Sequence, residues 1–161
     1  MIMNTPVKRP VLIISGFPGI GKTCCTSALN TIGLRCLDSD SSRFSWVEKD
    51  GVKERDPAFP ANYLGHIRSE MGRQDFILVS SHATVREALA GAKIPYTLVF
   101  PEMGLKDEYV QRYINRGSPD TFVNMLESKW EAFINECLND PTPSKIVLKS
   151  NEYILSRLVP V

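Results

Sequence analysis

One stretch of the chain decides its fold class: residues 10–23 read PVLIISGFPGIGKT. The run over 10–14 is short, rich in β-branched residues and soon followed by glycine, which predicts a strand buried on both faces. Residues 16–23 fit the pattern GxxxxGK[ST], and the apolar spacing after them predicts a helix over 23–32. A strand, a glycine-rich loop and a helix in this order are the setting in which such a loop binds phosphate.

This loop predicts a nucleotide cofactor, ATP, held together with Mg²⁺. Its glycines allow backbone N–H groups to turn inward around an anion, Lys22 would reach the β- and γ-phosphates, and the Thr23 hydroxyl would ligate the metal. A glycine-rich turn with a solvated lysine is the alternative, which the flanking strand and helix disfavour. The expected nucleotide-binding residues are Gly16, Phe17, Pro18, Gly19, Ile20, Gly21, Lys22 and Thr23.

The rest of the chain alternates apolar strands with helices. Four further strands are predicted at 34–37, 76–79, 96–100 and 145–148. Helices are predicted at 61–71, 84–90, 105–117 and 118–137, with a small one at the end, and a hairpin is predicted from 44–47 and 52–54. Strands that alternate with helices need crossover connections. We therefore expect an α/β fold, a three-layer sandwich around a five-stranded parallel sheet, in a single domain over residues 1–161.

Composition limits the possible partners. The 161 residues carry 19 Lys and Arg against 18 Asp and Glu, a formal net charge of +1, so any anion site must be local rather than a general basic surface. No run approaches the ~18 apolar residues of a membrane helix, and the first ten residues lack a secretory signal. We expect a cytoplasmic protein without a membrane partner, and the spacing of its four cysteines favours reduced, mostly buried thiols.

Two carboxylates follow the second expected strand, in Asp38-Ser39-Asp40. At the carboxyl end of a parallel strand they would face the phosphate loop, and two residues apart in an extended segment they would point to the same side. Kinases use carboxylates at this place in the metal shell or to accept the proton of the acceptor hydroxyl. Asp38 and Asp40 are therefore expected to be catalytic, with Asp38 joining Thr23 at the metal. Capping of a turn by either carboxylate is the alternative.

Arg112 and Arg116 lie four residues apart within the segment 101–119, so they share one face of a helix. Two guanidinium groups there would clamp the transferred phosphoryl group and neutralise its developing charge. The same residues are explained by a solvated helix face on which Glu108 pairs with Arg112.

Several residues near the other strand ends are candidates for holding the acceptor. Arg86 would bind an acceptor phosphate, with an ordinary surface role as the alternative. For His82 we favour the role of a polar turn residue or helix cap over that of a catalytic base. Trp46 and Tyr63 belong to the segment 41–72, which we expect to be the acceptor region; they would stack on an acceptor base, or else belong to the core.

Two classes of phosphate-loop protein are disfavoured. The strand 76–79 ends in Ser80-Ser81-His82, without the carboxylate that motor ATPases and recombinases use to hold Mg²⁺ and polarise water. No NKxD signature of GTPases occurs in the chain. A slowly hydrolysing ATPase that acts as a switch remains an alternative to a kinase.

Together these pieces resemble the P-loop kinase superfamily of nucleoside monophosphate, thymidylate and polynucleotide kinases. The resemblance implies a five-stranded parallel sheet with a phosphate loop, an acceptor region and an arginine-bearing lid, to which Arg112-Tyr113-Ile114-Asn115-Arg116 is similar. In polynucleotide kinases an Asp after the second strand, followed by a nearby Arg, acts as the base toward a hydroxyl. The residues that match it here are Asp38, Asp40 and Arg43.

A narrower resemblance rests on residues 38–46 (DSDSSRFSW), 59–63 (FPANY) and 79–82 (VSSH). These look like a group of small phage-associated kinases that includes the 5-hydroxymethyluracil DNA kinases. This resemblance implies transfer of the γ-phosphoryl group of ATP to the hydroxymethyl group of a modified base in DNA, with a free nucleoside or nucleoside monophosphate as the alternative acceptor. The oligomeric state stays open.

Overall fold

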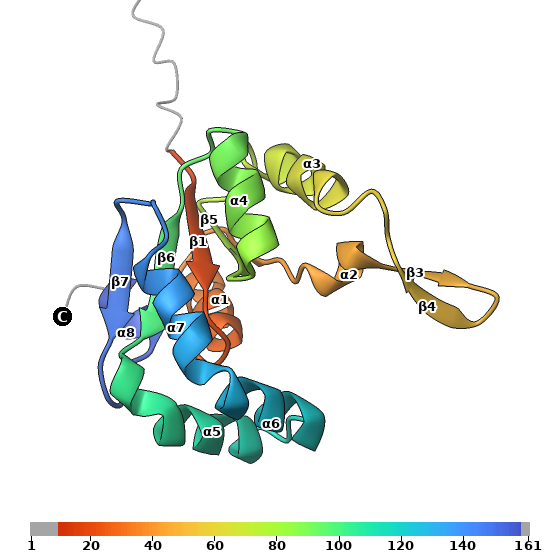
Figure 1. Ribbon diagram of the computed structural model, residues 1–161. Helices are drawn as coiled ribbons and strands as arrows, with labels where there is room; N and C mark the ends of the chain where they lie inside the picture. Colours follow the sequence, from red (N-terminus) through yellow and green to blue (C-terminus); the bar gives the residue numbers. More distant parts are fainter. Residues whose placement is uncertain (1–9, 159–161) are drawn as a thin grey trace, which may run out of the picture.

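The computed structural model of the protein describes residues 10–158 and has a five-stranded sheet at its centre (Figure 1). All neighbouring strands in this sheet are parallel, and their order is β2-β5-β1-β6-β7. The strands are β1 (Leu12–Gly16), β2 (Cys36–Asp38), β5 (Phe76–Ser80), β6 (Thr97–Pro101) and β7 (Lys145–Leu148). The expected α/β fold with a five-stranded parallel sheet is confirmed.

The strand that begins the phosphate-binding stretch is the middle strand of the sheet. β1 pairs with β5 on one side and β6 on the other, and Ile13, Ile14 and Ser15 are buried. The Ser15 hydroxyl donates to the Ser80 carbonyl at 3.0 Å, which satisfies the polar group inside the sheet. Because the sheet is parallel, the loops after β1, β2 and β5 leave it at the same edge.

Helices cover both faces of this sheet (Figure 1). α1 and α8 lie on one face, while α4 and α7 lie on the other, so the three expected layers are present. The helices are α1 (Lys22–Thr31), α2 (Ser42–Ser45), α3 (Ala61–Glu70), α4 (Ala83–Gly91), α5 (Lys106–Asn115), α6 (Asp120–Ser128), α7 (Trp130–Leu138) and α8 (Ile154–Leu158), with a 3₁₀ turn, η1 (Met103–Leu105), before α5. No helix within residues 10–158 is long and apolar enough to cross a membrane.

A two-stranded hairpin extends away from the sheet on the side of β2 (Figure 1). It consists of β3 (Trp46–Lys49) and β4 (Val52–Arg55), with the turn at Asp50 and Gly51. The hairpin was expected, but its first strand begins later than predicted. Phe44 instead lies in the short helix α2 and packs against Tyr63 and His66.

The helix predicted over 118–137 is two helices, and this expectation was wrong. The backbone leaves helical geometry at Lys129 (φ −104°, ψ 8°), between α6 and α7. Trp130 begins α7, is fully buried against Phe17 and Tyr109, and donates its indole N–H to the Met103 carbonyl at 2.8 Å. After the break, the large side chain of Trp130 lies in the core. The regular apolar spacing of residues 118–137 does not reveal this packing between distant segments.

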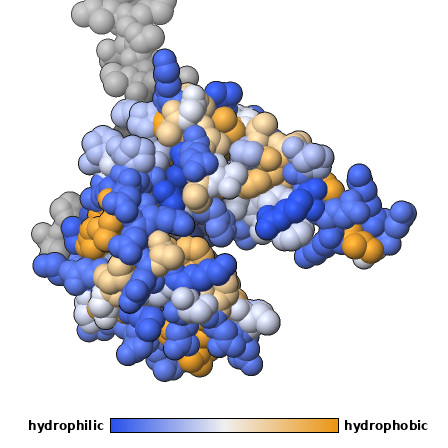
Figure 2. Space-filling view, viewed as in Figure 1, coloured by the Kyte–Doolittle hydropathy of each residue, from blue (hydrophilic) through white to orange (hydrophobic). Residues whose placement is uncertain are grey.

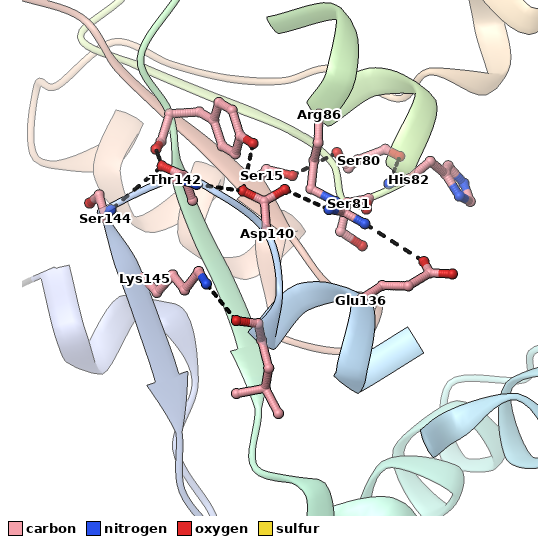
Figure 3. A network of polar contacts seen from close by, with 12 residues as sticks. Ser15, Ser80, Ser81, His82, Arg86, Glu136, Asp140, Thr142, Ser144 and Lys145 are labelled. Carbon is pink, nitrogen blue, oxygen red and sulfur yellow. Dashed lines mark hydrogen bonds and ion pairs between the residues drawn. The ribbon is translucent and has the colours of Figure 1, made fainter. Parts of the chain in front are cut away.

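A buried polar network joins α4 to the segment between α7 and β7 (Figure 3). Arg86 and Asp140 form an ion pair at 2.6 Å, and both side chains are almost completely buried. The Asp140 carboxylate also accepts from the Tyr96 hydroxyl and from the Thr142 N–H. Arg86 in turn donates to the Ser81 carbonyl at 2.8 Å, so the network holds the turn that follows β5.

Loss of the buried carboxylate should destabilise the protein strongly. We expect Asp140→Ala to lower the free energy of unfolding by about 3–5 kcal/mol, because it leaves the Arg86 charge buried without its main partner. The matched control is Glu136→Gln, since Glu136 lies 3.7 Å from Arg86 but is half exposed, and its loss should cost less than about 1 kcal/mol. Urea denaturation measures both, and equal effects of the two substitutions would contradict this account.

Candidate nucleotide and acceptor site

The candidate site is a cleft of about 880 Å³ at the edge of the sheet where the strands end. It is lined by the loop after β1, the Asp38-Ser39-Asp40 segment, the turn after β5, and parts of α5, α6 and α7. Figure 2 shows that the molecule is hollowed between the lobe of α5 and α6 and the arm formed by the hairpin. The topology therefore brings together the strand ends that the sequence singled out.

The phosphate loop is wrapped tightly by bulky side chains. Gly19 and Gly21 both have φ +90°, in the left-handed region that favours glycine. A Cβ on Gly19 would lie 2.9 Å from a ring carbon of Tyr113, and one on Gly21 would lie 3.0 Å from Tyr153. Glycine is therefore required at both positions by conformation and by space.

The outer carbonyls of this loop are all bonded. The Tyr113 hydroxyl donates to the Pro18 carbonyl, Arg112 donates to the Gly19 carbonyl, and the Ile154 N–H donates to the Ile20 carbonyl, each at 2.8–2.9 Å. Because C=O and N–H point in opposite directions across a peptide plane, these bonds turn N–H groups away from the wrapping side chains. Within residues 10–158, no hydrogen-bond acceptor pairs with the N–H groups of Gly19, Gly21, Lys22, Thr23 and Cys24. Such a cluster of unpaired donors at the start of a helix fits an anion.

Lys22 lies inside the same cleft. Its Nζ donates to the Gly16 carbonyl at 2.7 Å, and burial lowers its pKa to about 8. The nearby carboxylates of Asp38 and Asp40 act against this shift, and Arg116 adds to it. The ammonium group is thus held in a poorly hydrated place, where a phosphate would restore a favourable partner.

The two carboxylates after β2 have different surroundings. Asp38 accepts a hydrogen bond from the Thr23 hydroxyl at 3.4 Å. The two oxygen atoms, both possible metal ligands, therefore lie side by side. One oxygen of Asp40 accepts the Ser42 N–H at 2.9 Å, which is the turn-capping contact that the sequence left open. The other Asp40 oxygen has no partner among residues 10–158, and Asp40 lines the cleft.

The Thr23 and Asp38 oxygens suit Mg²⁺, which is commonly held by one or two carboxylates together with phosphate oxygens. Bound there, the metal would neutralise phosphate charge. Their positions fit the metal-ligand assignment predicted for both residues.

Tyr63 holds this segment from behind instead of lining the cleft. It is 1% exposed, and its hydroxyl donates to the Ser39 carbonyl at 2.7 Å. Stacking of Tyr63 on an acceptor base, one of the two predicted roles, is therefore excluded by its burial, and the core role is the one observed. Its place in the core keeps Ser39, and with it both neighbouring carboxylates, in position.

Arg112 connects the phosphate loop to the segment before α8 through hydrogen bonds. Beside its bond to Gly19, it donates to the Glu152 carbonyl at 3.1 Å and forms an ion pair with Glu108 at 3.4 Å. Its guanidinium group also lies over the rings of Tyr109 and Tyr153. The expected pairing with Glu108 is present, but Arg112 is buried in these contacts and is not on a solvated face.

Arg116 has fewer partners. Its Nε donates to the Ser118 hydroxyl at 2.9 Å, and its guanidinium group lies 5.0 Å from the ring centre of Tyr113 and 5.5 Å from that of Phe122. It lines the cleft and is close enough to Lys22 to lower the pKa of that lysine. Of the two arginines, Arg116 is the one placed to meet charge that develops in the cleft.

His82 and Arg86 line the cleft on the side of α4. The pKa of His82 is lowered, first by burial and then by the charge of Lys22, so the imidazole is neutral near pH 7. Arg86 is buried, with its guanidinium group engaged by Asp140, Glu136 and the Ser81 carbonyl. It is thus neither an ordinary surface arginine nor a free phosphate ligand.

Two candidates for the acceptor site lie outside the lining of the cleft. Trp46 is at the base of the hairpin, is 41% exposed and has the Arg55 guanidinium group 4.2 Å from its ring centre. Arg43 is in α2, next to the hairpin. Neither is among the residues that line the cleft, so contact with an acceptor there would require one that extends beyond the cleft.

One part of the cleft is apolar and was not predicted from the sequence. Phe122, Met125 and Phe133 line it from α6 and α7, and Tyr153 lines it from the segment before α8. Phe122 and Phe133 belong to the segment 118–137, for which only a helix was predicted and no part in a site. Both side chains are only partly buried, and no local pattern distinguishes a residue of an apolar helix face that lines a cleft from one in the core.

ATP binding should weaken as the pH rises through about 8. Burial lowers the Lys22 pKa to about 8 in the free protein, so above this pH the lysine loses the proton, and the positive charge, that attracts phosphate. Calorimetric titration with ATP from about pH 7 to about 9.5 should show a rising Kd. In the control, Lys22→Met should bind weakly with little pH dependence. The same pH dependence in both proteins would contradict the assignment.

Comparison with protein-family models and with curated proteins found no match. Among solved structures, the chain is similar to a gluconokinase from Sinorhizobium meliloti 1021, with a TM-score of 0.52 and 15% sequence identity over 94% of both chains. It is also similar to an uncharacterized protein from Eubacterium ventriosum ATCC 27560, with a TM-score of 0.51 and 15% identity over 90% of this chain and 92% of the other. With the sheet and phosphate loop described above, the first of these similarities shows that the chain has the α/β fold of P-loop kinases.

Proposed function

We propose that the protein is an ATP- and Mg²⁺-dependent kinase that phosphorylates a hydroxyl group on a nucleotide-type acceptor. The observation that carries this proposal is the cluster of five unpaired N–H groups described above, at Gly19 and over residues 21–24. Lys22 and two carboxylates line the same cleft. Donors for phosphate, oxygen ligands for a metal and a carboxylate for a hydroxyl proton are the components of phosphoryl transfer.

Each residue has a role that follows from its contacts. The loop N–H groups and Lys22 hold the phosphates of ATP, while Thr23 and Asp38 provide oxygen ligands to the metal. The free oxygen of Asp40 accepts the proton of the acceptor hydroxyl, whose oxygen forms a bond to the γ-phosphorus as the bond to ADP breaks. Arg116 stabilises the charge of the transferred group, and Arg112 holds the loop in shape.

For the acceptor we favour the hydroxymethyl group of 5-hydroxymethyluracil in DNA. Support comes from the resemblance of residues 38–46, 59–63 and 79–82 to the phage-associated kinases, and from a cleft that opens beside an exposed arm carrying Trp46 and Arg55 (Figure 2). A strand of DNA is long enough to contact this arm while one base enters the cleft. A free nucleoside or nucleoside monophosphate is the alternative. The gluconokinase similarity adds a sugar acid to the acceptors worth testing.

A panel of acceptors with γ-labelled ATP tests the proposal. The panel contains DNA with 5-hydroxymethyluracil, single-stranded and duplex, the matching free nucleoside and monophosphate, ordinary nucleoside monophosphates, and gluconate. Thymine DNA of the same sequence is the matched control, because it lacks only the hydroxyl. We expect label in the hydroxymethyluracil DNA, more readily in the single strand because its base is already unpaired.

Other outcomes of the panel have distinct meanings. Label in free nucleosides or nucleotides but not in DNA would replace the preferred acceptor by the alternative. Release of inorganic phosphate without a labelled acceptor would overturn the kinase proposal in favour of an ATPase or switch.

Replacement of Asp40 and replacement of Asp38 should change the kinetics of the reaction in different ways. Asp40→Asn should lower kcat about 100-fold or more while the KM for ATP stays unchanged, because it removes the proton acceptor but not the nucleotide site. Asp38→Asn should instead raise the Mg²⁺ concentration needed for half-maximal activity, since Asp38 stands beside Thr23. Steady-state kinetics over a range of Mg²⁺ concentrations measures both. Equal losses with unchanged Mg²⁺ dependence would show that the roles are wrongly assigned.

A further inference from the structure

The apolar wall of the cleft is a feature that phosphoryl transfer itself does not need. We use this name for Phe122 and Met125 of α6 and Phe133 of α7, which are partly buried and line the cleft. Leu126 and Cys137, both buried, back the same wall. Aromatic and thioether side chains on the wall of a cavity are the environment in which a flat, weakly hydrated ring is held.

The apolar wall is connected to the acceptor side of the site. Arg86 donates to the Ser81 carbonyl and also pairs with Glu136 of α7, so α7 and the turn after β5 are joined through one side chain (Figure 3). His82 of that turn is close enough to Asp40 for the carboxylate to act on its pKa. The wall therefore belongs to the side of the cleft where Asp40 would receive a hydroxyl group.

One carboxylate stands at the edge of the apolar wall. Glu136 lines the cleft, is 53% exposed at its side chain and lies 3.7 Å from Arg86 through one oxygen. The Arg86 charge is already matched by buried Asp140 at 2.6 Å. Glu136 is thus a second carboxylate beside a guanidinium group that already has a closer partner, and its second oxygen has no partner among residues 10–158. It can accept an N–H from a ring that lies on the wall.

We propose that the apolar wall seats the nucleobase of the acceptor and that Glu136 accepts the N–H of its polar edge. Where Glu136 faces the ring N3, this favours a base of the uracil type, whose N3–H is a donor, over a base of the cytosine type, whose N3 is an acceptor. The inference rests on the proposed kinase function and adds to it the class of base and the residues that recognise it. The base of ATP is the competing occupant of the wall.

Substitutions at Phe133 test whether the apolar wall binds the nucleobase of the acceptor. Phe133→Ala should raise the KM for the hydroxymethyluracil acceptor about tenfold, because stacking on one aromatic ring is lost. Phe133→Leu should give a smaller rise, since it keeps apolar volume without a flat ring. Leu138→Ala is the matched control, because Leu138 is an exposed apolar residue of the same helix outside the cleft. The KM for ATP should stay unchanged in all three, and thermal unfolding should confirm that each variant is folded.

Glu136→Gln tests recognition of the edge. A glutamine can accept from the N–H of uracil but can also donate to the N3 of cytosine. We expect the preference for 5-hydroxymethyluracil over 5-hydroxymethylcytosine in otherwise identical single-stranded DNA, measured as the ratio of kcat/KM values, to fall about tenfold. An unchanged ratio would remove Glu136 from base recognition.

The possible failures are distinguishable. A rise in the KM for ATP with an unchanged acceptor KM would assign the apolar wall to the donor nucleotide and overturn the seat. Unchanged values for both substrates in Phe133→Ala and Phe133→Leu would show that the wall is merely a surface of the core. If the wild-type protein labels none of the acceptors, it is the proposed function that fails.

Discussion

The site depends on one constraint, the outward fixing of three successive carbonyl groups in the phosphate loop. The carbonyl groups of Pro18, Gly19 and Ile20 each accept a hydrogen bond from outside the loop. The donors are, in the same order, Tyr113, Arg112 and Ile154. Five N–H groups of the loop and of the start of α1 have no partner in the described chain, a cost that a bound anion would remove. The wrapping rings of α5 and of the segment before α8 leave no room for a Cβ at Gly19 or Gly21. Anion binding is thus a property of the surrounding packing as much as of the eight-residue motif.

Much of the fold and the centre of the site are predictable from sequence because they rest on local patterns. The apolar run before Gly16, the loop and the strand–helix alternation lead directly to the parallel sheet. The place of Asp38 beside Thr23 follows from that topology. Other features depend on contacts between distant segments. After the break at Lys129, Trp130 bonds to Met103, 27 residues earlier in the chain, and the buried Arg86 pairs with Asp140, 54 residues later.

The turn after β5 has no carboxylate and is held by hydrogen bonds from Ser15 and Arg86. Where motor ATPases carry a carboxylate, this chain has Ser80-Ser81-His82, held by the Ser15 hydroxyl at one residue and by Arg86 at the next. The turn is fixed by a buried ion pair whose other end lies next to β7. His82 of this turn lines the cleft but carries no carboxylate, and the negative charge near Lys22 comes from Asp38 and Asp40. The electrostatics of the cleft are therefore arranged around the end of β2 rather than that of β5.

The bond from Ile154 to Ile20 has a consequence for biosynthesis. The phosphate motif emerges from the ribosome early, but the donors that shape it belong to α5 and to the segment that starts α8. Until residue 154 has been synthesised, the loop lacks at least one of the three outer donors that hold its concave form. We therefore expect a nascent chain to form the concave loop only after residue 154, and a chain that stops before this residue to lose it although residues 16–23 are intact.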